Sequence, residues 1–279
     1  MILIADSGST KTSWALTAPG STLCDTLVTA GMNPLTSEAS QLAQHCDVVR
    51  QWVGERRVDA AYFYGAGCGT LEARQLIASH LQRPFPSVLW HIGSDLEGAC
   101  RAALGHKAGM VGILGTGSNA CLFDGQTVTR HLPSLGYLLG DEGSGNHIGR
   151  LLLKGYFEER MPQPLRNMLS EEYHLEYKEV IHHIYHQSNP NAYLAQFAPF
   201  ARSHRDNAFI ANLLHDVFQQ YLHHLVQPLG CQELHLVGSI AYHFHEEILD
   251  VAGSMGISVS SPILQSPISG LIAHFQTTR

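Results

Sequence analysis

Short apolar runs separated by polar loops open the chain. Residues 1–5 are all apolar, and small and large side chains alternate over residues 13–16, Ser-Trp-Ala-Leu, as in a strand with two different faces. Between them lies the polar segment 6–12, Asp-Ser-Gly-Ser-Thr-Lys-Thr. This pattern predicts a β-hairpin around a loop of glycine and hydroxyl residues.

The same arrangement recurs later in the chain. The apolar run 110–114 leads into Gly-Thr-Gly-Ser-Asn at 115–119, and a second run at 120–123 is followed by the turn pair Asp124-Gly125. A repeated strand, loop and strand predicts two related domains.

Helical and extended patterns alternate through the remaining sequence. Before residue 110 we expect a helix, a strand, a helix and a strand, at 37–53, 60–64, 72–81 and 88–92. After Asp141 the apolar positions have the spacing of amphipathic helices, at 144–159, 177–185, 192–201 and 208–225. A strand at 234–237 and helices at 242–252 and 268–275 complete the pattern. Strands alternating with helices predict a mixed α/β architecture.

Composition excludes several classes of protein. The chain has 279 residues, enough for two ordinary domains, and its formal net charge is −7. An acidic chain lacks the basic field that holds a nucleic acid or an anionic membrane, so we expect neither partner. The six cysteines include no CxxC pair, and the first apolar run stops at Asp6, far short of a signal peptide. We therefore expect a cytoplasmic protein.

The loop after the first strand carries candidate chemistry. It matches neither a Walker loop nor the Gly-x-Gly-x-x-Gly fingerprint. Gly8 would let backbone N–H groups approach phosphate oxygens, together with the hydroxyls of Ser9 and Thr10. Lys11 completes this predicted ATP-binding loop, and Asp6 at the strand end would hold Mg²⁺ through water. An ordinary hairpin turn is the alternative explanation.

Two further glycine segments suit a nucleotide. Thr116 and Gly117 belong to the second loop, which would grip the β- and γ-phosphates as the first loop does. Gly238 and Ser239 lie between a predicted strand and a helix, whose N-terminus attracts anions or lets a flat base approach. A plain turn between strand and helix is the alternative for this pair.

Two carboxylates follow predicted strands or precede predicted helices. Asp95 comes after the strand at 88–92 and before a helix that stops at Gly105. It is the candidate general base that takes the proton of an attacking hydroxyl, and a plain helix N-cap is the alternative. Asp141 lies at a helix start, where it would accept hydrogen bonds from sugar hydroxyls or simply stabilise the helix dipole.

Six motifs taken together resemble a known family. In chain order they are DSGSTKT at 6–12, GMN at 31–33, GAGCG at 65–69, SD with a helix ending in ALG at 94–105, GTGSN at 115–119 and GDEGSG at 140–145. This order resembles the BadF/BadG-type ATPases and, among them, the N-acetylglucosamine kinases of the actin/hexokinase-like superfamily. The GTGSN and GDEGS pair after the SD helix is the part most specific to kinases.

The resemblance implies a fold and a reaction. The fold would be α/β, with two ribonuclease-H-like domains at 1–107 and 108–267, and ATP and sugar in a cleft between them. The second domain would contain a helical insertion, and the terminal helix 268–279 would pack back on the first domain. ATP and Mg²⁺ would be the cofactors, and N-acetylglucosamine would be phosphorylated to its 6-phosphate.

The resemblance also implies roles for individual residues. Asp95 would be the base, and Thr10 and Thr116 would contact the phosphates. Gly238 and Ser239 would lie near the adenosine. The sugar would be bound by four residues, Asn33, Ser118, Asn119 and Asp141.

One departure from the family bears on the substrate. Such kinases often carry a Trp two residues before the equivalent of Tyr137, and this chain has Leu135 there. Glucosamine and N-acetylmuramic acid therefore stay open as alternative substrates.

Other functions occur in the same superfamily. An ATPase that activates a dehydratase or reductase needs cysteines close enough to hold an iron–sulfur cluster, and even the nearest pair here, Cys100 and Cys121, forms no motif. A sugar-sensing repressor needs a DNA-binding extension. We therefore expect a sugar kinase, and a homodimer is one assembly that the sequence leaves open.

Overall fold

The computed structural model describes residues 1–21 and 23–277, which form two compact units. The first unit consists of Met1–Ala108, Phe123–Val128 and the segment that begins at Ser266. The second consists of Gly109–Leu122 and Thr129–Gln265. Two five-stranded sheets form the framework. The domain limits predicted from the resemblance, 1–107 and 108–267, stay predictions.

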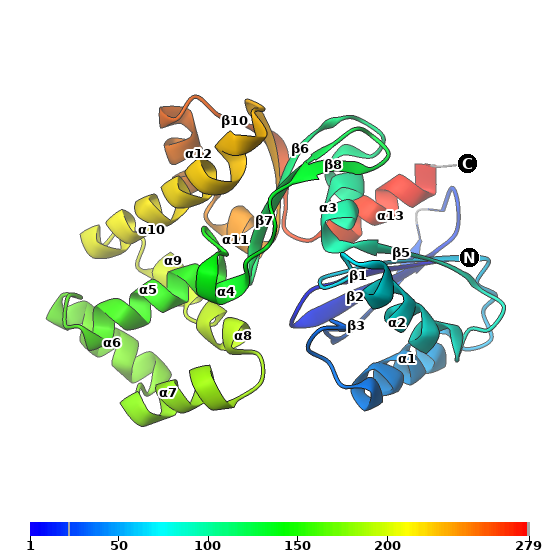
Figure 1. Cartoon of the computed structure of the whole chain (residues 1–279), viewed down its shortest axis with the longest axis horizontal. Helices are drawn as coiled ribbons and strands as arrows, with labels where there is room; N and C mark the ends of the chain where they lie inside the picture. The colour runs from blue at the N-terminus through cyan, green and yellow to red at the C-terminus, as the bar shows by residue number, and fades with distance from the viewer. Residues whose placement is uncertain (22, 278–279) are drawn as a thin grey trace. The chain divides into compact units, whose positions relative to one another are not determined.

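The sheet of the first unit runs in the order β3-β2-β1-β4-β5 (Figure 1). Its strands are β1 Ile2–Ser7, β2 Lys11–Thr17, β3 Cys24–Ala30, β4 Ala60–Gly65 and β5 Leu89–Ser94. β1 and β2 form the predicted antiparallel hairpin, in which Ser7 pairs with Thr12. β1, β4 and β5 are parallel and therefore end at one edge of the sheet, where Asp6 and Ser94 lie.

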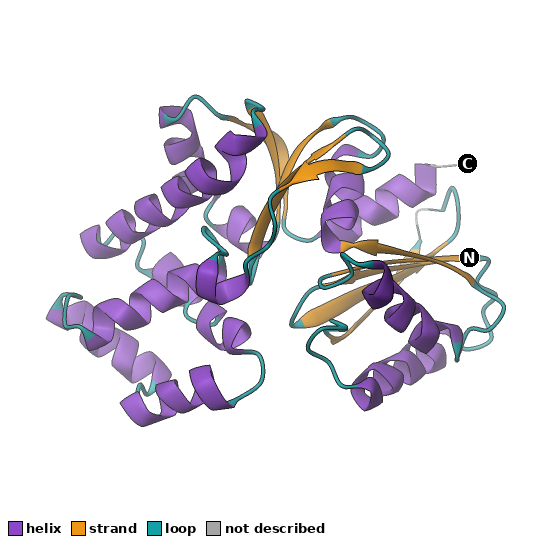
Figure 2. Ribbon diagram, viewed as in Figure 1, coloured by secondary structure: helices purple, strands orange, loops and turns teal. Residues whose placement is uncertain are grey.

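Helices cover both faces of this sheet (Figure 2). α1 Ala39–Val53 and α2 Leu71–Gln82 pack on one face, and α3 Asp95–Leu104 and α13 Pro267–Thr277 lie on the other. The period of two in β1 explains this sandwich, because Leu3 is buried with the side chains of α1 and α2, whereas Ile4 is buried with Leu271 of α13.

The terminal helix is part of the first unit. α13 packs against α3, β1 and β2. Gly270 permits the close approach to α3, because a Cβ atom at this position would lie only 2.3 Å from Ala102 O. The helix predicted at 268–279 corresponds to α13, and residues 278 and 279 lie outside the described residues.

The sheet of the second unit runs in the order β10-β9-β6-β7-β8. Its strands are β6 Gly109–Leu114, β7 Ser118–Phe123, β8 Val128–His131, β9 Glu233–Val237 and β10 Ser258–Leu264. Read from β8, this order repeats that of the first sheet, with β6 in the place of β1 and β9 in the place of β4. β9 is parallel to both β6 and β10. The predicted fold class, α/β with two related sheets, is confirmed.

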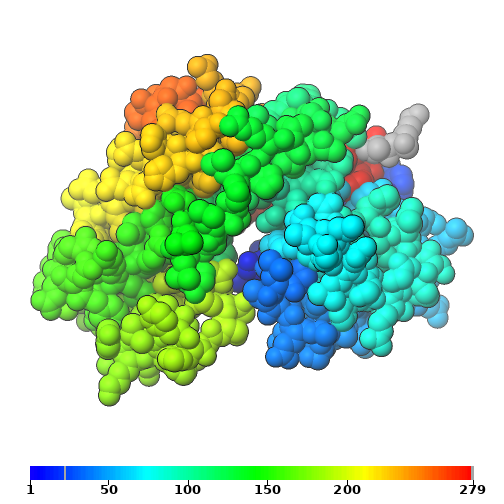
Figure 3. Space-filling model, viewed as in Figure 1, coloured from blue at the N-terminus to red at the C-terminus, as the bar shows by residue number. Residues whose placement is uncertain are grey.

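Most helices of the second unit lie between β8 and β9. They are α4 Gly136–Leu139, α5 Gly145–Phe157, α6 Gln163–Tyr173, α7 Tyr177–His186, α8 Pro190–Ala195, α9 Ala198–Ser203 and α10 Ala208–Tyr221. α11 Ser239–His243 and α12 His245–Ser254 follow β9. The helices from α5 to α10, green to yellow in Figure 3, form one continuous mass around a core that includes Leu152, Leu214 and Phe218. No helix in the described ranges is both long and apolar enough to cross a membrane.

Three strands and one helix have weak signals in the sequence. β3 and β8 are edge strands with mostly exposed or half-buried side chains, so they lack a strong apolar pattern. β10 contains Pro262, which argues against a strand when only the sequence is read. α6 buries only Leu165 and Leu169, so its apolar stripe is faint.

Three predicted helices differ in the structure. The stretch 192–201 is divided between α8 and α9, because Pro199 has no N–H to continue a helix and instead occupies the first turn of α9. α10 ends at Tyr221, and a π-helical turn over 222–226 follows it. The helix predicted at 242–252 corresponds to α12, and the short α11 precedes it.

Candidate active site

The predicted first phosphate loop joins β1 to β2. The Gly8 N–H donates to Lys11 O at 2.9 Å, and this bond closes a tight turn. Beneath the turn, the hydroxyls of Ser7 and Thr12 are 2.8 Å apart and buried. Thr10 and Lys11 are exposed, and Ser9 is half-buried. The loop therefore offers its hydroxyl and ammonium groups to a ligand while its base is fixed.

The GMN segment supports this loop from the side. The Gly31 N–H donates to Thr10 O at 3.1 Å, and the Met32 N–H donates to Ser7 Oγ at 3.0 Å. A Cβ atom on residue 31 would lie 2.6 Å from Gly8 O, so only glycine allows this approach. Asn33 follows, and its Oδ1 accepts the Leu35 N–H at 2.9 Å, so its amide NH₂ is the group suited to a sugar oxygen.

Asp6 lies near the end of β1 and is half-buried. Its Oδ2 accepts a long hydrogen bond, 3.4 Å, from Ser266 Oγ at the start of the terminal segment. Loss of hydration and the negative charge of Asp95 raise the pKa of Asp6 to about 7, against weaker opposing effects of Ser266 and Lys11. The two carboxylates therefore share one electrostatic environment.

Asp95 is the first residue of α3, and it is not the helix cap. Ser94 is the N-cap, because its side chain accepts the Glu97 N–H at 3.2 Å. The alternative role for Asp95 as the N-cap is therefore wrong. Its Oδ1 accepts the neighbouring Leu96 N–H, at 3.0 Å, and burial raises the pKa of this carboxyl against the smaller, opposing effect of backbone N–H groups.

The donors around Asp6 suit a hydrated Mg²⁺. Asp6 and Asp95 concentrate negative charge, which a divalent cation would neutralise. Among the described residues there is no group of three or more His, Cys, Asp or Glu side chains that could enclose a metal ion. Mg²⁺ usually keeps several waters and binds through one or two carboxylates and substrate phosphates, and Asp6 offers one such carboxylate.

The second loop, Gly115–Asn119, is bonded to the start of α5. The Gly145 N–H donates to Gly115 O at 2.8 Å, and the Asn146 N–H donates to Thr116 O at 3.1 Å. Asn146 Nδ2 donates to the same carbonyl at 2.8 Å. Thr116 is therefore fixed through its backbone, and its hydroxyl remains for a phosphate oxygen.

Asp141 lies directly against this loop. Its Oδ1 accepts the Ser118 N–H at 3.2 Å, and its Oδ2 accepts Asn146 Nδ2 at 2.8 Å. A Cβ atom on residue 117 would lie 3.0 Å from the Asp141 carboxylate, so Gly117 makes room for it. Burial raises the pKa of Asp141, although these two hydrogen bonds oppose the shift.

Two of the residues predicted to bind sugar have most of their polar groups engaged within the chain. Ser118 is buried, and its Oγ donates to Glu142 O at 2.6 Å. Asn119 Oδ1 accepts the Ala120 N–H at 2.8 Å, and Asn119 O accepts the hydroxyl of the fully buried Tyr221 at 3.0 Å. The geometry thus gives Ser118 a part in holding Asp141, and its contact with sugar stays a prediction.

Gly238 and Ser239 lie where β9 passes into α11. Gly238 has φ of 122°, and a Cβ atom there would lie 2.2 Å from Leu114 O at the end of β6. This close packing requires glycine. A cavity of about 530 Å³ lies beyond this turn, among α11, α12 and β10, and neither Gly238 nor Ser239 lines it. Its lining includes Arg202, Arg205, Tyr242, His243, Glu246 and Pro262.

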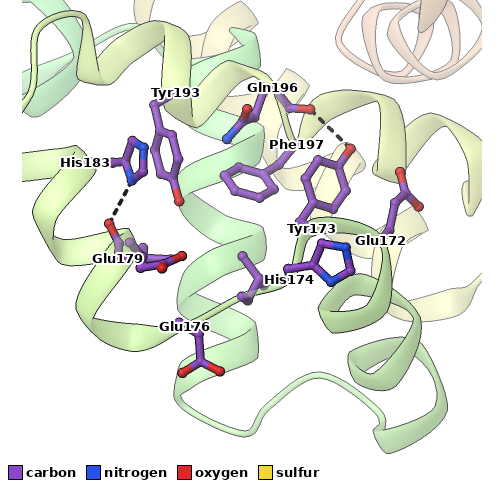
Figure 4. A pocket seen from close by; sticks show the side chains of 11 residues that line it. Glu172, Tyr173, His174, Glu176, Glu179, His183, Tyr193, Gln196 and Phe197 are labelled. Carbon is purple, nitrogen blue, oxygen red and sulfur yellow. Dashed lines mark hydrogen bonds between the residues drawn. The ribbon is translucent and has the colours of Figure 1, made fainter.

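A second cavity, of about 290 Å³, lies among α6, α7 and α8 (Figure 4). Tyr173, Tyr193 and Phe197 form its aromatic wall, and the Tyr173 hydroxyl donates to Gln196 O at 3.2 Å. None of the residues predicted to bind ATP, metal or sugar lines this cavity. It is therefore separate from the candidate site.

The structure gathers the predicted residues into two groups, one in each unit. In the first unit, Asp6 and Asp95 lie near the edge reached by β1 and β5. In the second, the loop with Thr116 is bonded to the segment with Asp141.

Comparison with solved structures then identifies the family. The chain matches a candidate N-acetylglucosamine kinase from Porphyromonas gingivalis with 35% sequence identity and a TM-score of 0.94, covering 100% of this chain and 99% of that one. The chain belongs to the sugar kinases of the actin/hexokinase-like superfamily.

More distant structures share the fold alone. A candidate N-acetylglucosamine kinase from Chromobacterium violaceum matches with a TM-score of 0.73 and 17% identity, covering 99% of this chain and 98% of that one. A ROK-family glucokinase from Streptomyces griseus, in complex with glucose and AMPPNP, matches with a TM-score of 0.61 and 14% identity, covering 99% of each chain. No protein-family model and no curated protein matches the sequence. The expectation of an ATP-dependent sugar kinase is confirmed, and the finer placement among BadF/BadG-type ATPases stays a prediction.

Two residues of this sugar kinase's candidate site escape sequence reasoning. Asn146 is the second residue of a helix, where a buried amide leaves no distinctive pattern. Ser266 stands just before α13, where it reads as an ordinary residue at a helix start, and its contact with Asp6 spans nearly the whole chain. The GDEGSGN run that includes Asn146 is the only signal that could have pointed to the first of them.

Proposed function

We propose that this sugar kinase transfers the γ-phosphate of ATP to a hydroxyl of an amino sugar, with N-acetylglucosamine and its 6-hydroxyl as the first choice. The observation that carries the proposal is the position of Asp95. Its charge is close enough to Asp6 to raise the pKa of that carboxyl, and Ser94, not Asp95, caps the helix. Burial raises the pKa of Asp95 itself, as suits a general base.

The proposed reaction uses Asp95 as the base. Its carboxylate accepts the proton of the sugar hydroxyl as the oxygen forms a bond to the γ-phosphorus. The bond from that phosphorus to the bridging oxygen of ADP breaks, and ADP leaves with the electron pair. When bound through Asp6 and water, Mg²⁺ would neutralise charge on the phosphates.

The proposed ATP contacts come from both glycine loops. Gly8, Ser9, Thr10 and Lys11 form the first, and Thr116 and Gly117 belong to the second. Their fixed backbones support this assignment, because a preformed loop needs little reorganisation when a phosphate binds. Gly238 and Ser239 stay the proposed contacts of the adenosine, and the cavity of about 530 Å³ begins further along α11, at Tyr242.

The proposed sugar contacts are Asn33, Ser118, Asn119 and Asp141. The carboxylate of Asp141 is the strongest of these acceptors because it carries a charge, and two N–H donors hold it in one orientation. Leu135 is 60% exposed just before α4, so an apolar side chain is available in this segment to a substituent of the sugar. In N-acetylglucosamine this substituent would be the acetamido group. Glucosamine and N-acetylmuramic acid stay as alternative substrates.

A coupled assay of ADP release tests this function. The purified protein is supplied with ATP, Mg²⁺ and one sugar at a time, from a panel of N-acetylglucosamine, glucosamine, N-acetylmuramic acid and glucose. We expect release with N-acetylglucosamine well above the rate without sugar. Protein that binds ATP but releases ADP with none of these sugars would contradict the proposal.

A further inference from the structure

Asn146 connects the two binding segments of the second unit. It is fully buried in the first turn of α5. Its Nδ2 donates to Asp141 Oδ2 and to Thr116 O, each at 2.8 Å. One amide group therefore joins the carboxylate proposed for the sugar to the loop proposed for the phosphates.

The neighbours of Asn146 determine the orientation of its amide. Both partners of Nδ2 are acceptors, so the NH₂ group and not the oxygen must face them, and both of its hydrogens are used. The oxygen, Oδ1, is buried without a hydrogen-bond partner in the described part of the chain. A buried acceptor without a partner is destabilising, so an apolar side chain would fill this space at lower cost. The two hydrogen bonds that the amide donates therefore explain its presence here better than side-chain packing does.

Asp141 depends on this amide for its orientation. Its backbone is in the left-handed region, with φ of 59°, which is uncommon for a residue other than glycine. The Ser118 N–H holds only Oδ1, so without Asn146 the carboxylate would turn about its Cβ–Cγ bond. Of the nearby charged groups, Glu142 disfavours ionisation of Asp141 and Arg150 favours it.

We propose that Asn146 is a positioning residue of this kinase, which touches neither ligand but holds the Asp141 carboxylate for the sugar and the Thr116 loop for the phosphates. This inference rests on the proposed function. The two effects are unequal, because Thr116 O also accepts the backbone N–H of residue 146, and this bond survives any change of the side chain. Loss of the amide should therefore impair use of the sugar more than use of ATP.

Two substitutions test the proposal. Asn146→Leu keeps the approximate size of the side chain and removes both N–H donors. Asn146→Ser has a smaller side chain and serves as the test if the leucine variant does not fold. We expect kcat/KM for the sugar to fall about 10- to 100-fold, as is typical when a supporting partner is lost, with a much smaller rise in KM for ATP. In the pH profile of kcat/KM for the sugar, the acidic limb should move to higher pH. The reason is that the ionised Asp141 carboxylate has lost a hydrogen-bond donor, which raises its pKa.

The matched control is Leu152→Ala, a buried change on the same helix outside this network. It should lower the melting temperature and leave the acidic limb in place. In a double-mutant cycle, Asn146→Ser should have little further effect on the sugar once Asp141→Ala is present.

The outcomes separate this inference from the function beneath it. Wild-type protein that phosphorylates no sugar overturns the proposed function and the inference with it. An active wild type whose folded Asn146 variants keep its kcat/KM for the sugar and its acidic limb overturns only the positioning role.

Discussion

Ser94 caps α3 in place of Asp95: the Ser94 side chain accepts the Glu97 N–H at 3.2 Å, and the Asp95 carboxylate accepts the adjacent Leu96 N–H at 3.0 Å. This arrangement leaves Asp95 at the end of a parallel strand with a carboxylate available for proton transfer. A capping carboxylate would accept a backbone N–H from the second or third residue of the helix. The assignment of the general base rests on this difference.

Replacing the base should abolish most of the chemistry. Asp95→Asn keeps the size of the side chain but cannot accept the hydroxyl proton, so turnover should fall roughly 10²- to 10⁴-fold with ATP affinity nearly unchanged. Steady-state kinetics and ATP titration measure the two effects. Glu97→Gln, two residues further along α3, is the matched control and should retain activity. A folded Asp95→Asn protein with normal turnover would remove Asp95 from this role.

Replacing the proposed metal residue should change the demand for Mg²⁺. Asp6→Asn removes the charge that attracts the hydrated ion, so turnover should fall and half-maximal activity should require much more Mg²⁺. A Mg²⁺ titration of initial rates measures this. The exposed Asp47→Asn is the control for a lost carboxylate elsewhere in the first unit. An Mg²⁺ dependence identical to that of the wild type would count against the assignment.

The buried His147 should make the protein sensitive to acid. Burial lowers its pKa to about 4, and its Nδ1 accepts the Gly143 N–H at 3.2 Å, so the folded state keeps it neutral. The unfolded chain binds a proton below roughly pH 6.5, so stability should be lost as pH falls from about 6.5 to 4, by at most about 1.4 kcal/mol per pH unit from this group.

Chemical unfolding at pH 7 and pH 5 measures that loss. His147→Gln cannot take up a proton and should lose less stability between these two values than the wild type does. His186→Gln, an exposed change, should behave like the wild type. Equal losses in all three proteins would show that His147 does not titrate in this way.

Leu135 should influence the choice of sugar. Leu135→Ala removes apolar surface, and a small apolar contact discriminates between related groups by only about 1–3 kcal/mol. We expect the relative kcat/KM values for N-acetylglucosamine, glucosamine and N-acetylmuramic acid to change, with KM for ATP nearly constant. Kinetics over the three sugars measure this, and an effect on ATP alone would contradict the assignment.

Sequence patterns predicted the strands whose two faces are both buried. The hairpin of β1 and β2 and the later strand β6 are wholly or largely buried, so their apolar runs are unmistakable. The edge strand β3 and the proline-containing β10 depend on neighbouring strands for their hydrogen bonds, which no local pattern records. These two strands are therefore recognised from the pairing within their sheets and not from their own sequences.

The candidate site shows a similar division. Asp6, Asp95 and Thr116 follow strands or glycine loops, so local spacing together with the family resemblance points to them. Asn146 and Ser266 act through side-chain contacts that depend on tertiary folding, and their own positions carry only helix-start signals. The N-cap alternative for Asp95 could not be decided without coordinates, because Ser94 and Asp95 are both good capping residues.

The transfer of phosphate itself tests the central claim most directly. Purified protein is incubated with Mg²⁺, N-acetylglucosamine and ATP labelled on its γ-phosphate, and the sugar product is separated and analysed by mass spectrometry and ³¹P NMR. We predict that label appears on N-acetylglucosamine as a phosphate monoester on the 6-hydroxyl, in step with ADP formation, and that Asp95→Asn nearly abolishes it. Folded, ATP-binding wild-type protein that leaves N-acetylglucosamine, glucosamine and N-acetylmuramic acid all unlabelled would contradict the claim.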